Sequence, residues 1–146
     1  NGVLVEGRQV YVAGQIGCST EGIFAKGFTG QFRLVLENTM AVLAEANAGP
    51  QHLTRMTWYI TDLGLYRTAA REVGAIYREV FGRYYPTMTM VEVSGLLDEK
   101  ALIEIESIAV IPKAKTAAPT GFDATAIANP NITAEAAIFQ NVRVLF

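Results

Sequence analysis

The spacing of apolar residues in this chain switches repeatedly between two periods, and this alternation constrains the fold more than any other feature. Two segments carry apolar residues at helical spacing. In the first, residues 31–48, one face collects Phe32, Val35, Leu36, Thr39, Leu43 and Ala46. In the second, one face collects Tyr66, Ala69, Val73, Ile76, Tyr77 and Val80. Gly49-Pro50 and Gly82 are stop signals for the two helices, and Thr29 is a candidate cap for the first.

Segments of β-branched and aromatic residues at period two lie before, between and after these helices. They predict strands at residues 3–6, 9–14, 53–61, 87–94 and 101–111, with a further short one at 23–25. Gly7-Arg8 has the length of a hairpin turn between the first two. The predicted order is β-β-(β)-α-β-α-β-β, an α+β fold in which two βαβ-like halves share one sheet and both helices pack on one face. No third helix is predicted for the other face, so other subunits are expected to cover it.

The last part of the chain changes character. Residues 113–133 are rich in Pro, Ala, Thr, Asn and Gly, which predicts a linker or extended arm. Apolar residues return at 134–146, which predicts one more strand that docks on a sheet edge or on a neighbouring subunit. The missing initiator methionine and the apolar end at Phe146 lead us to expect a processed or incomplete part of a longer protein.

Composition excludes several classes of protein. With 51% hydrophobic and 18% charged residues, disorder is not expected over most of the length. A net charge of −2 without a Lys/Arg cluster argues against nucleic-acid binding, and no apolar run approaches the roughly 18 residues of a membrane span. The single cysteine, Cys18, cannot form an internal disulfide, which fits a cytoplasmic location. Cys18 and the single histidine, His52, cannot build the usual zinc sets, so we expect no metal and no cofactor.

Five stretches, in order and at matching spacing, resemble the Rid (reactive intermediate deaminase) family, which includes the endoribonuclease L-PSP-like proteins. They are residues 12–17, Asn38 with 42–46, 58–63, 84–93 and 102–110. Each stretch alone is common, and the combination is specific for the fold. The resemblance covers about residues 2–112, so we expect a Rid-like domain at 1–112 and an arm at 113–146.

The resemblance implies a chorismate-mutase-like subunit that forms a homotrimer, with the sheets in a central barrel and the helices outside. Three clefts then lie between neighbouring subunits. The best-known members of the family hydrolyse enamine and imine intermediates, such as 2-aminoacrylate and its imine, to a keto acid and ammonia. The expected partners are therefore a small-molecule substrate and two further copies of the chain.

The resemblance also implies the site residues. Its catalytic acid corresponds to Glu104, and its substrate-binding positions correspond to Ala13, Gly14, Gln15, Met88 and Met90. Deaminating members carry an arginine at the position of Met88, where two hydrogen bonds grip the substrate carboxylate. They carry a serine at the position of Ala13 and a cysteine-like residue at that of Met90. Because a methionine cannot offset the desolvation of a carboxylate, we expect an uncharged or aromatic-like substrate with the two methionines as adaptable walls.

Each candidate has a structural alternative. Glu104 alternates with Ile103 and Ile105, so we expect it on the face opposite the core, where it could orient water or shuttle a proton. The alternative is a solvated or interface-paired acid. Gly14 and Gln15 can bring backbone N–H groups close to a ligand, or they simply form a bulged strand end.

Three functions stay open on these residues: an imine- or enamine-resolving enzyme, a trimeric binding module that has lost catalysis, and a domain of a larger enzyme. An endoribonuclease role is disfavoured because the chain has no basic stripe.

Overall fold

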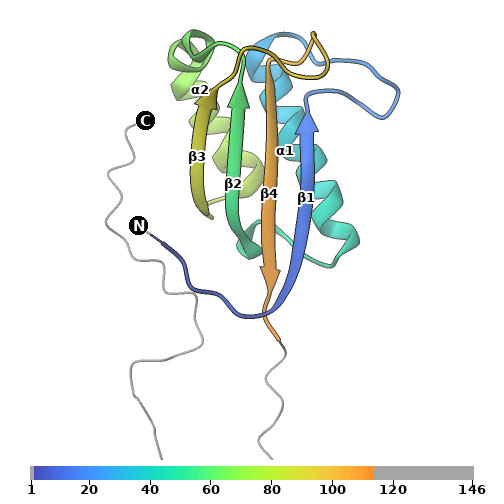
Figure 1. Ribbon diagram of the computed structural model, residues 1–146, viewed down its shortest axis with the longest axis vertical. Helices are drawn as coiled ribbons and strands as arrows, with labels where there is room; N and C mark the ends of the chain where they lie inside the picture. The colour runs from blue at the N-terminus through green and yellow to red at the C-terminus, as the bar shows by residue number, and fades with distance from the viewer. Residues whose placement is uncertain (1, 114–146) are drawn as a thin grey trace, which may run out of the picture.

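The computed structural model describes residues 2–113 of the chain (Figure 1). The elements are β1 (Arg8–Ile16), α1 (Gly27–Glu45), a short 3-10 helix η1 (Pro50–His52), β2 (Leu53–Ile60), α2 (Leu63–Phe81), β3 (Thr87–Glu92) and β4 (Ile103–Ile111). The predicted α+β class is confirmed, as are both helices and the strands at 9–14, 53–61, 87–94 and 101–111, within a few residues at each end. Residues 114–146, on which nearly all of the predicted arm and its final strand fall, lie outside the described residues.

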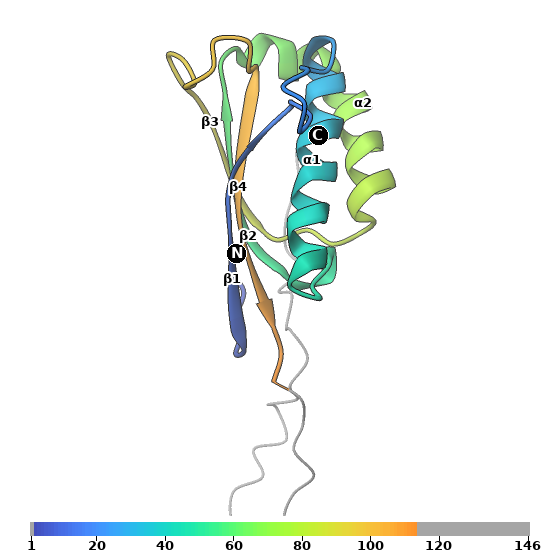
Figure 2. The same cartoon turned by 90° about the vertical axis from the view of Figure 1, so that its right-hand side faces the viewer.

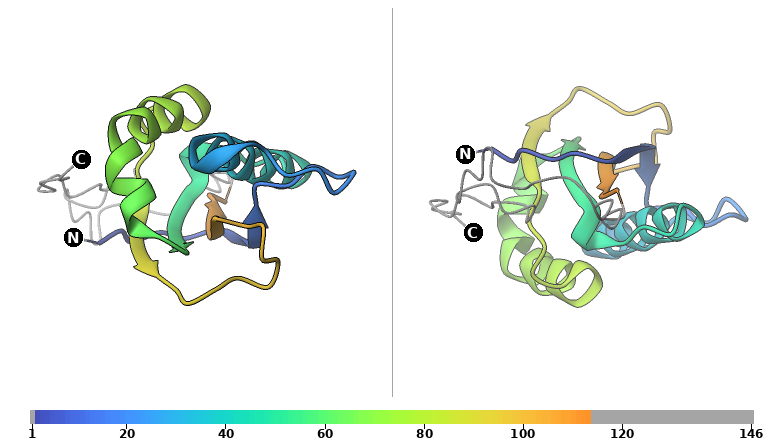
Figure 3. Two further views of the ribbon diagram at one scale, coloured as in Figure 1. Left: turned by 90° about the horizontal axis from the view of Figure 1, so that it is seen from above. Right: turned by 90° about the horizontal axis from the view of Figure 1, so that it is seen from below.

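The four strands form one mixed sheet in the order β1-β4-β2-β3. β4 runs antiparallel to both of its neighbours, and β2 and β3 are parallel. β1 and β2 therefore run in the same direction on either side of β4. Each helix connects a pair of parallel strands, and the right-handed crossover rule places both helices on the same side of the sheet. Figure 2 shows the two layers edge-on, with the other sheet face left uncovered by the described residues, and Figure 3 shows the same layers from each end.

The core lies between the sheet and the helices because the strands alternate as predicted. Ile103 and Ile105 of β4 are fully buried on the helix side, and so are Met56 and Ile60 of β2. The helices contribute large side chains from one face each, among them Phe32, Val35, Leu36, Leu43, Val73, Tyr77 and Phe81. The predicted helical faces are thus the faces that pack on the sheet.

A buried amide ties α1 to the start of β4. Gln31 is 4% exposed, and its Nε2 donates to the carbonyl of Lys100 at 2.9 Å while its Oε1 accepts from the backbone N–H of Leu102 at 2.8 Å. Both polar ends of the side chain are satisfied, which removes the cost of burying it. This pair of hydrogen bonds holds the chain where it enters the strand that carries Glu104.

Two predicted strands do not form. Residues 3–6 lie outside the sheet, so the hairpin through Gly7-Arg8 was wrong. Leu4 and Val5 stay 88% and 38% exposed, because they meet no apolar face among residues 2–113. Residues 23–25 make only one isolated bridge, between Cys18 and Phe24. The observed order is therefore β-α-β-α-β-β.

The first helix begins earlier than predicted. Phe28 is buried one turn before Phe32, so the apolar face extends back to Gly27 and Thr29 lies inside the helix instead of capping it. Lys26 precedes the helix and makes no side-chain cap. Among residues 2–113, no helix has the length and hydrophobicity that crossing a membrane requires.

Candidate functional site

Glu104 lies on the uncovered face of the sheet. It is half-buried, while its neighbours Ile103 and Ile105 are fully buried on the helix side, as the alternation predicts. In the sheet it pairs with Ile16 of β1 and with Tyr59 of β2. Among the described residues, its carboxylate has no hydrogen-bond or ion-pair partner. The acid is thus held near the middle of the sheet with its oxygens unengaged.

A bulge in β1 brings Gly14 against this carboxylate. The β1–β4 register shifts between Val12 and Gln15, so Ala13 and Gly14 form an extra step in the strand. A Cβ built on Gly14 would overlap the Glu104 carboxylate, at 2.7 Å from its Cδ. Gln15 closes the bulge, since its Nε2 donates to the carbonyl of Ala13 at 3.0 Å. The bulged strand end is therefore present, and the missing side chain of Gly14 makes room for the acid.

Other groups on the same face surround Glu104. The hydroxyl of Tyr59 donates to Glu106 Oε1 at 3.1 Å, and this hydrogen bond, with a smaller contribution from burial, raises the pKa of Tyr59. The hydroxyl of Thr57, next to them on β2, is buried and has no hydrogen-bond partner among the residues that the structure describes. Tyr59 was not among the residues chosen from the sequence. Its alternation with Trp58 on a predicted strand was the signal that it faces away from the core.

Met88 and Met90 lie on the opposite face. They pair in parallel register with Met56 and Trp58, whose side chains point toward the helices. Met90 packs against the core, and Met88 is partly exposed at the edge strand. The single subunit therefore brings Glu104 and Gly14 together but separates them from the two methionines by the thickness of the sheet.

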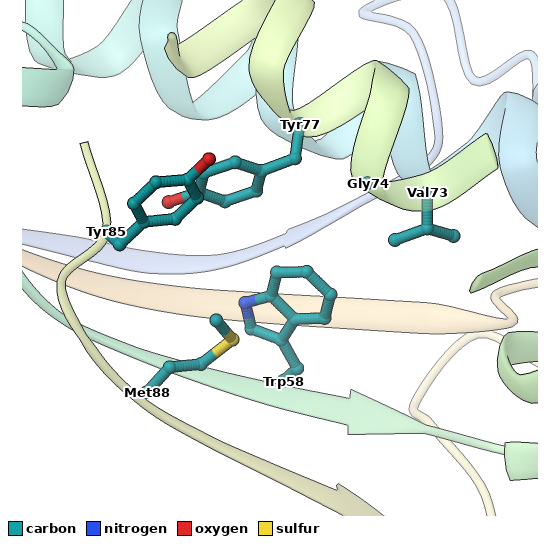
Figure 4. Close-up of a pocket in the computed structure, with 6 residues that line it drawn as sticks. All are labelled: Trp58, Val73, Gly74, Tyr77, Tyr85 and Met88. Carbon is teal, nitrogen blue, oxygen red and sulfur yellow. The ribbon is translucent and has the colours of Figure 1, made fainter. Parts of the chain in front are cut away.

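Met88 forms part of a small apolar pocket between α2 and the sheet (Figure 4). The pocket is lined by Trp58, Val73, Gly74, Tyr77, Tyr85 and Met88. Tyr77 and Tyr85 are stacked, with ring centroids 5.5 Å apart and planes at 10°. The hydroxyl of Tyr77 donates to the carbonyl of Tyr84 at 2.7 Å, and burial raises the pKa of Tyr77, so the phenol stays a neutral donor. The lining carries no charged side chain.

The remaining chemical candidates, His52 in η1 and Cys18 in the loop after β1, lie outside the site. His52 Nδ1 accepts from the backbone N–H of Gly49 at 3.0 Å and closes the turn before β2. Cys18 is half-buried in the loop after β1. In the described part of the chain, no three His, Cys, Asp or Glu residues gather where they could hold a metal ion.

The split βαβ unit around β4 and the two-helix layer define a chorismate-mutase-like α+β subunit. The chain belongs to the Rid family, since residues 1–111 match the family described as endoribonuclease L-PSP. This confirms the resemblance found in the sequence.

Its relatives are similar over most of their length. A RutC family protein of Pyrococcus abyssi is 37% identical over 105 residues, 70% of this chain and 79% of the relative. TdcF of Escherichia coli K12, provisionally named a reactive intermediate deaminase, is 34% identical over 108 residues, 71% of this chain and 80% of TdcF. The crystal structure of E. coli TdcF with bound serine matches with a TM-score of 0.62 at 30% identity, covering 75% of this chain and 85% of that one.

Proposed function

We propose that this protein resolves a reactive imine or enamine, or a related small molecule, at clefts between subunits, with Glu104 handling the protons. The observation that carries the proposal is the unengaged carboxylate of Glu104, seated against Gly14 on an uncovered sheet face. The family supports the class of reaction, because TdcF is provisionally named a reactive intermediate deaminase.

The chemistry fits one carboxyl group. Hydrolysis of an imine adds water across the C=N bond and then breaks the C–N bond, giving a carbonyl compound and ammonia. The protonated acid donates to the nitrogen, and the carboxylate accepts a proton from the attacking water. Glu104 is then protonated again, so it donates to the amine nitrogen as the C–N bond breaks and accepts the proton of the hydroxyl group that becomes the carbonyl. One carboxyl group therefore serves both steps.

We propose a homotrimer in which a neighbouring copy completes each site. Met88 and Met90 lie on the helix side of the sheet and Glu104 lies on the other side. A site that uses both sets takes one set from each of two subunits. Residues 1–112 form the unit that assembles in this way, and the expected compartment remains the cytoplasm.

The standard 2-imino acids are not the expected substrates. Their carboxylate needs a cation, and the position that the family uses for it is Met88 in this chain. The apolar lining around Met88 favours a neutral imine instead. Benzaldimine, made from benzylamine by an amine oxidase, should be hydrolysed faster than 2-iminopropanoate, made from alanine by an amino-acid oxidase.

The decisive variant is Glu104→Gln, which keeps the shape and removes the titrating group. We expect it to lower the catalysed rate by roughly a hundredfold or more, the range that general acid–base groups supply. Glu106→Gln, two residues along the same face, is the matched control and should keep most of the activity. Equal rates for Glu104→Gln and the unmodified protein would remove Glu104 from the mechanism.

The alternative is a trimeric binding module without catalysis, which the apolar Met88 position favours. The same assay separates the two, since a binding module accelerates hydrolysis of neither imine while calorimetry still shows that it binds a neutral ligand.

A further inference from the structure

The pocket beside Met88 contains a buried donor that none of residues 2–113 satisfies. Trp58 is 1% exposed, and its Nε1 has no hydrogen-bond partner within this part of the chain. In Figure 4 this nitrogen lies on the side of the indole ring that faces Met88 and Tyr85. Buried N–H groups in folded proteins nearly always have a partner. The only other polar group of the lining side chains that is deeply placed, the hydroxyl of Tyr77, is already engaged with the carbonyl of Tyr84.

The space beside this donor comes from Gly74 on α2. A Cβ at that position would meet only Arg78 Nη1, at 3.4 Å, so the helix leaves a gap over the pocket. The cavity volume is about 10 Å³, roughly the room for one water molecule. Helix interiors disfavour glycine, so a glycine here keeps the pocket open at some expense in helix stability.

Two side chains that close the pocket also reach solvent. Met88 is 36% exposed and Tyr85 is 42% exposed. Methionine has three flexible bonds and adapts its shape easily. Because Met88 lies on the edge strand β3, we expect its rotation away from Trp58 to enlarge the cavity and connect it to the surface.

We infer that this pocket binds a small neutral molecule, an apolar or aromatic ring with one hydrogen-bond acceptor, such as a carbonyl oxygen that accepts from Trp58 Nε1. The aromatic rings of Tyr85 and Tyr77 offer a flat surface on which the ring of the ligand packs, and the side chain of Met88 covers the ligand from the sheet side. Anions are disfavoured because none of the lining side chains carries a charge, and the nearby guanidinium of Arg78 lies beside Gly74 and outside that lining. The inference rests on the proposed function in that Met88 belongs to the substrate site, and it adds to the neutral class a hydrogen-bond acceptor that pairs with Trp58 Nε1.

The test reads binding at Trp58 directly and needs no turnover, so its failure is distinct from a failure of the proposed catalysis. Trp58 is the only tryptophan in the chain, so a ¹H–¹⁵N spectrum contains a single indole N–H signal. Acetophenone should shift this signal saturably. Ethylbenzene has nearly the same shape without the acceptor and should bind about tenfold more weakly, the difference that one hydrogen bond makes. Benzoate should leave the signal unmoved.

Two variants on α2 locate the site. Gly74→Leu fills the gap and should abolish the acetophenone shift. Ala75→Leu adds the same side chain at the next, exposed position and should leave the shift intact. An indole signal that acetophenone does not move in the unmodified protein overturns the inference and means that the pocket holds water only. Equal affinity for benzoate overturns the neutral class, and an undiminished shift in a folded Gly74→Leu protein places the ligand elsewhere.

Discussion

At the scale of single residues, the candidate site depends on Gly14, because only a residue without a side chain leaves room for the Glu104 carboxylate. The sequence indicated Gly14 as a possible backbone donor or as part of a bulged strand end, and it indicated Glu104 separately. The structure adds that the Glu104 carboxylate occupies the space where a Cβ on Gly14 would lie. The atom that would be displaced is the end of a flexible side chain, so a substitution there moves the acid before it disturbs the fold.

Gly14→Ala tests this arrangement. We expect the carboxylate of Glu104 to shift, and imine hydrolysis to fall by about tenfold or more, within the contribution of a positioned acid–base group. The melting temperature should change little. Gly30→Ala is the control, because its Cβ would make only an ordinary contact at 3.6 Å with Ala25. A crystal structure of Gly14→Ala with the Glu104 carboxylate unmoved would contradict the positioning role, whatever the kinetics.

At the scale of elements, the sequence predicted what depends on local periodicity. The faces of α1 and α2 and the inward side of β4 follow from spacing alone, since each element buries one stripe of its own side chains. The strand at 3–6 failed because apolar alternation forms a strand only where a partner edge and a buried face are present, and both are properties of distant parts of the chain. Leu4, 88% exposed, shows the result.

The placement of the candidate residues on two different sheet faces could not be predicted from the sequence either. The inward direction of Met88 follows from its parallel pairing with Met56, a long-range contact made through the α2 crossover. Glu104 was predictable to face outward because it lies between two isoleucines. The unsatisfied Trp58 donor could not be predicted, because it requires knowledge of what surrounds the indole in three dimensions.

Two carboxylates accept hydrogen bonds from the first backbone N–H groups of α2. Asp62 Oδ1 accepts from Gly64 N at 2.7 Å and caps the helix, and Glu92 Oε2 of β3 accepts from Leu63 N at 2.7 Å. Asp62→Ala should lower the free energy of unfolding by about 1 kcal/mol, the usual value of an N-cap. Asp62→Asn should restore most of it, since asparagine caps equally well. Urea denaturation measures both, and equal midpoints for Asp62→Ala and the unmodified protein would show that Glu92 alone secures this helix start.

At the scale of the whole molecule, the uncovered sheet face is the feature that a single chain does not explain. In addition to the half-buried Glu104, the face carries Tyr11, 70% exposed, and Val91, 38% exposed. Apolar side chains on a broad sheet face gain stability when another surface removes them from water. The helices already occupy the other side of the sheet, so the second surface has to come from outside the described residues.

The proposed homotrimer predicts a specific response to charge on this face. The unmodified protein should sediment with three times the chain mass at micromolar concentration, and its melting temperature should rise with concentration, because assembly stabilises only the folded subunit. Val91→Glu places a carboxylate on the face beside Tyr59, and burying it between subunits without a partner is costly. We expect this variant to be monomeric and to lose hydrolysis of benzaldimine, since each proposed site needs residues from two copies.

Thr68→Glu adds the same charge on the exposed surface of α2 and should leave both mass and activity unchanged. A monomer mass for the unmodified protein, or a trimer that survives Val91→Glu intact, would mean that another surface covers this face.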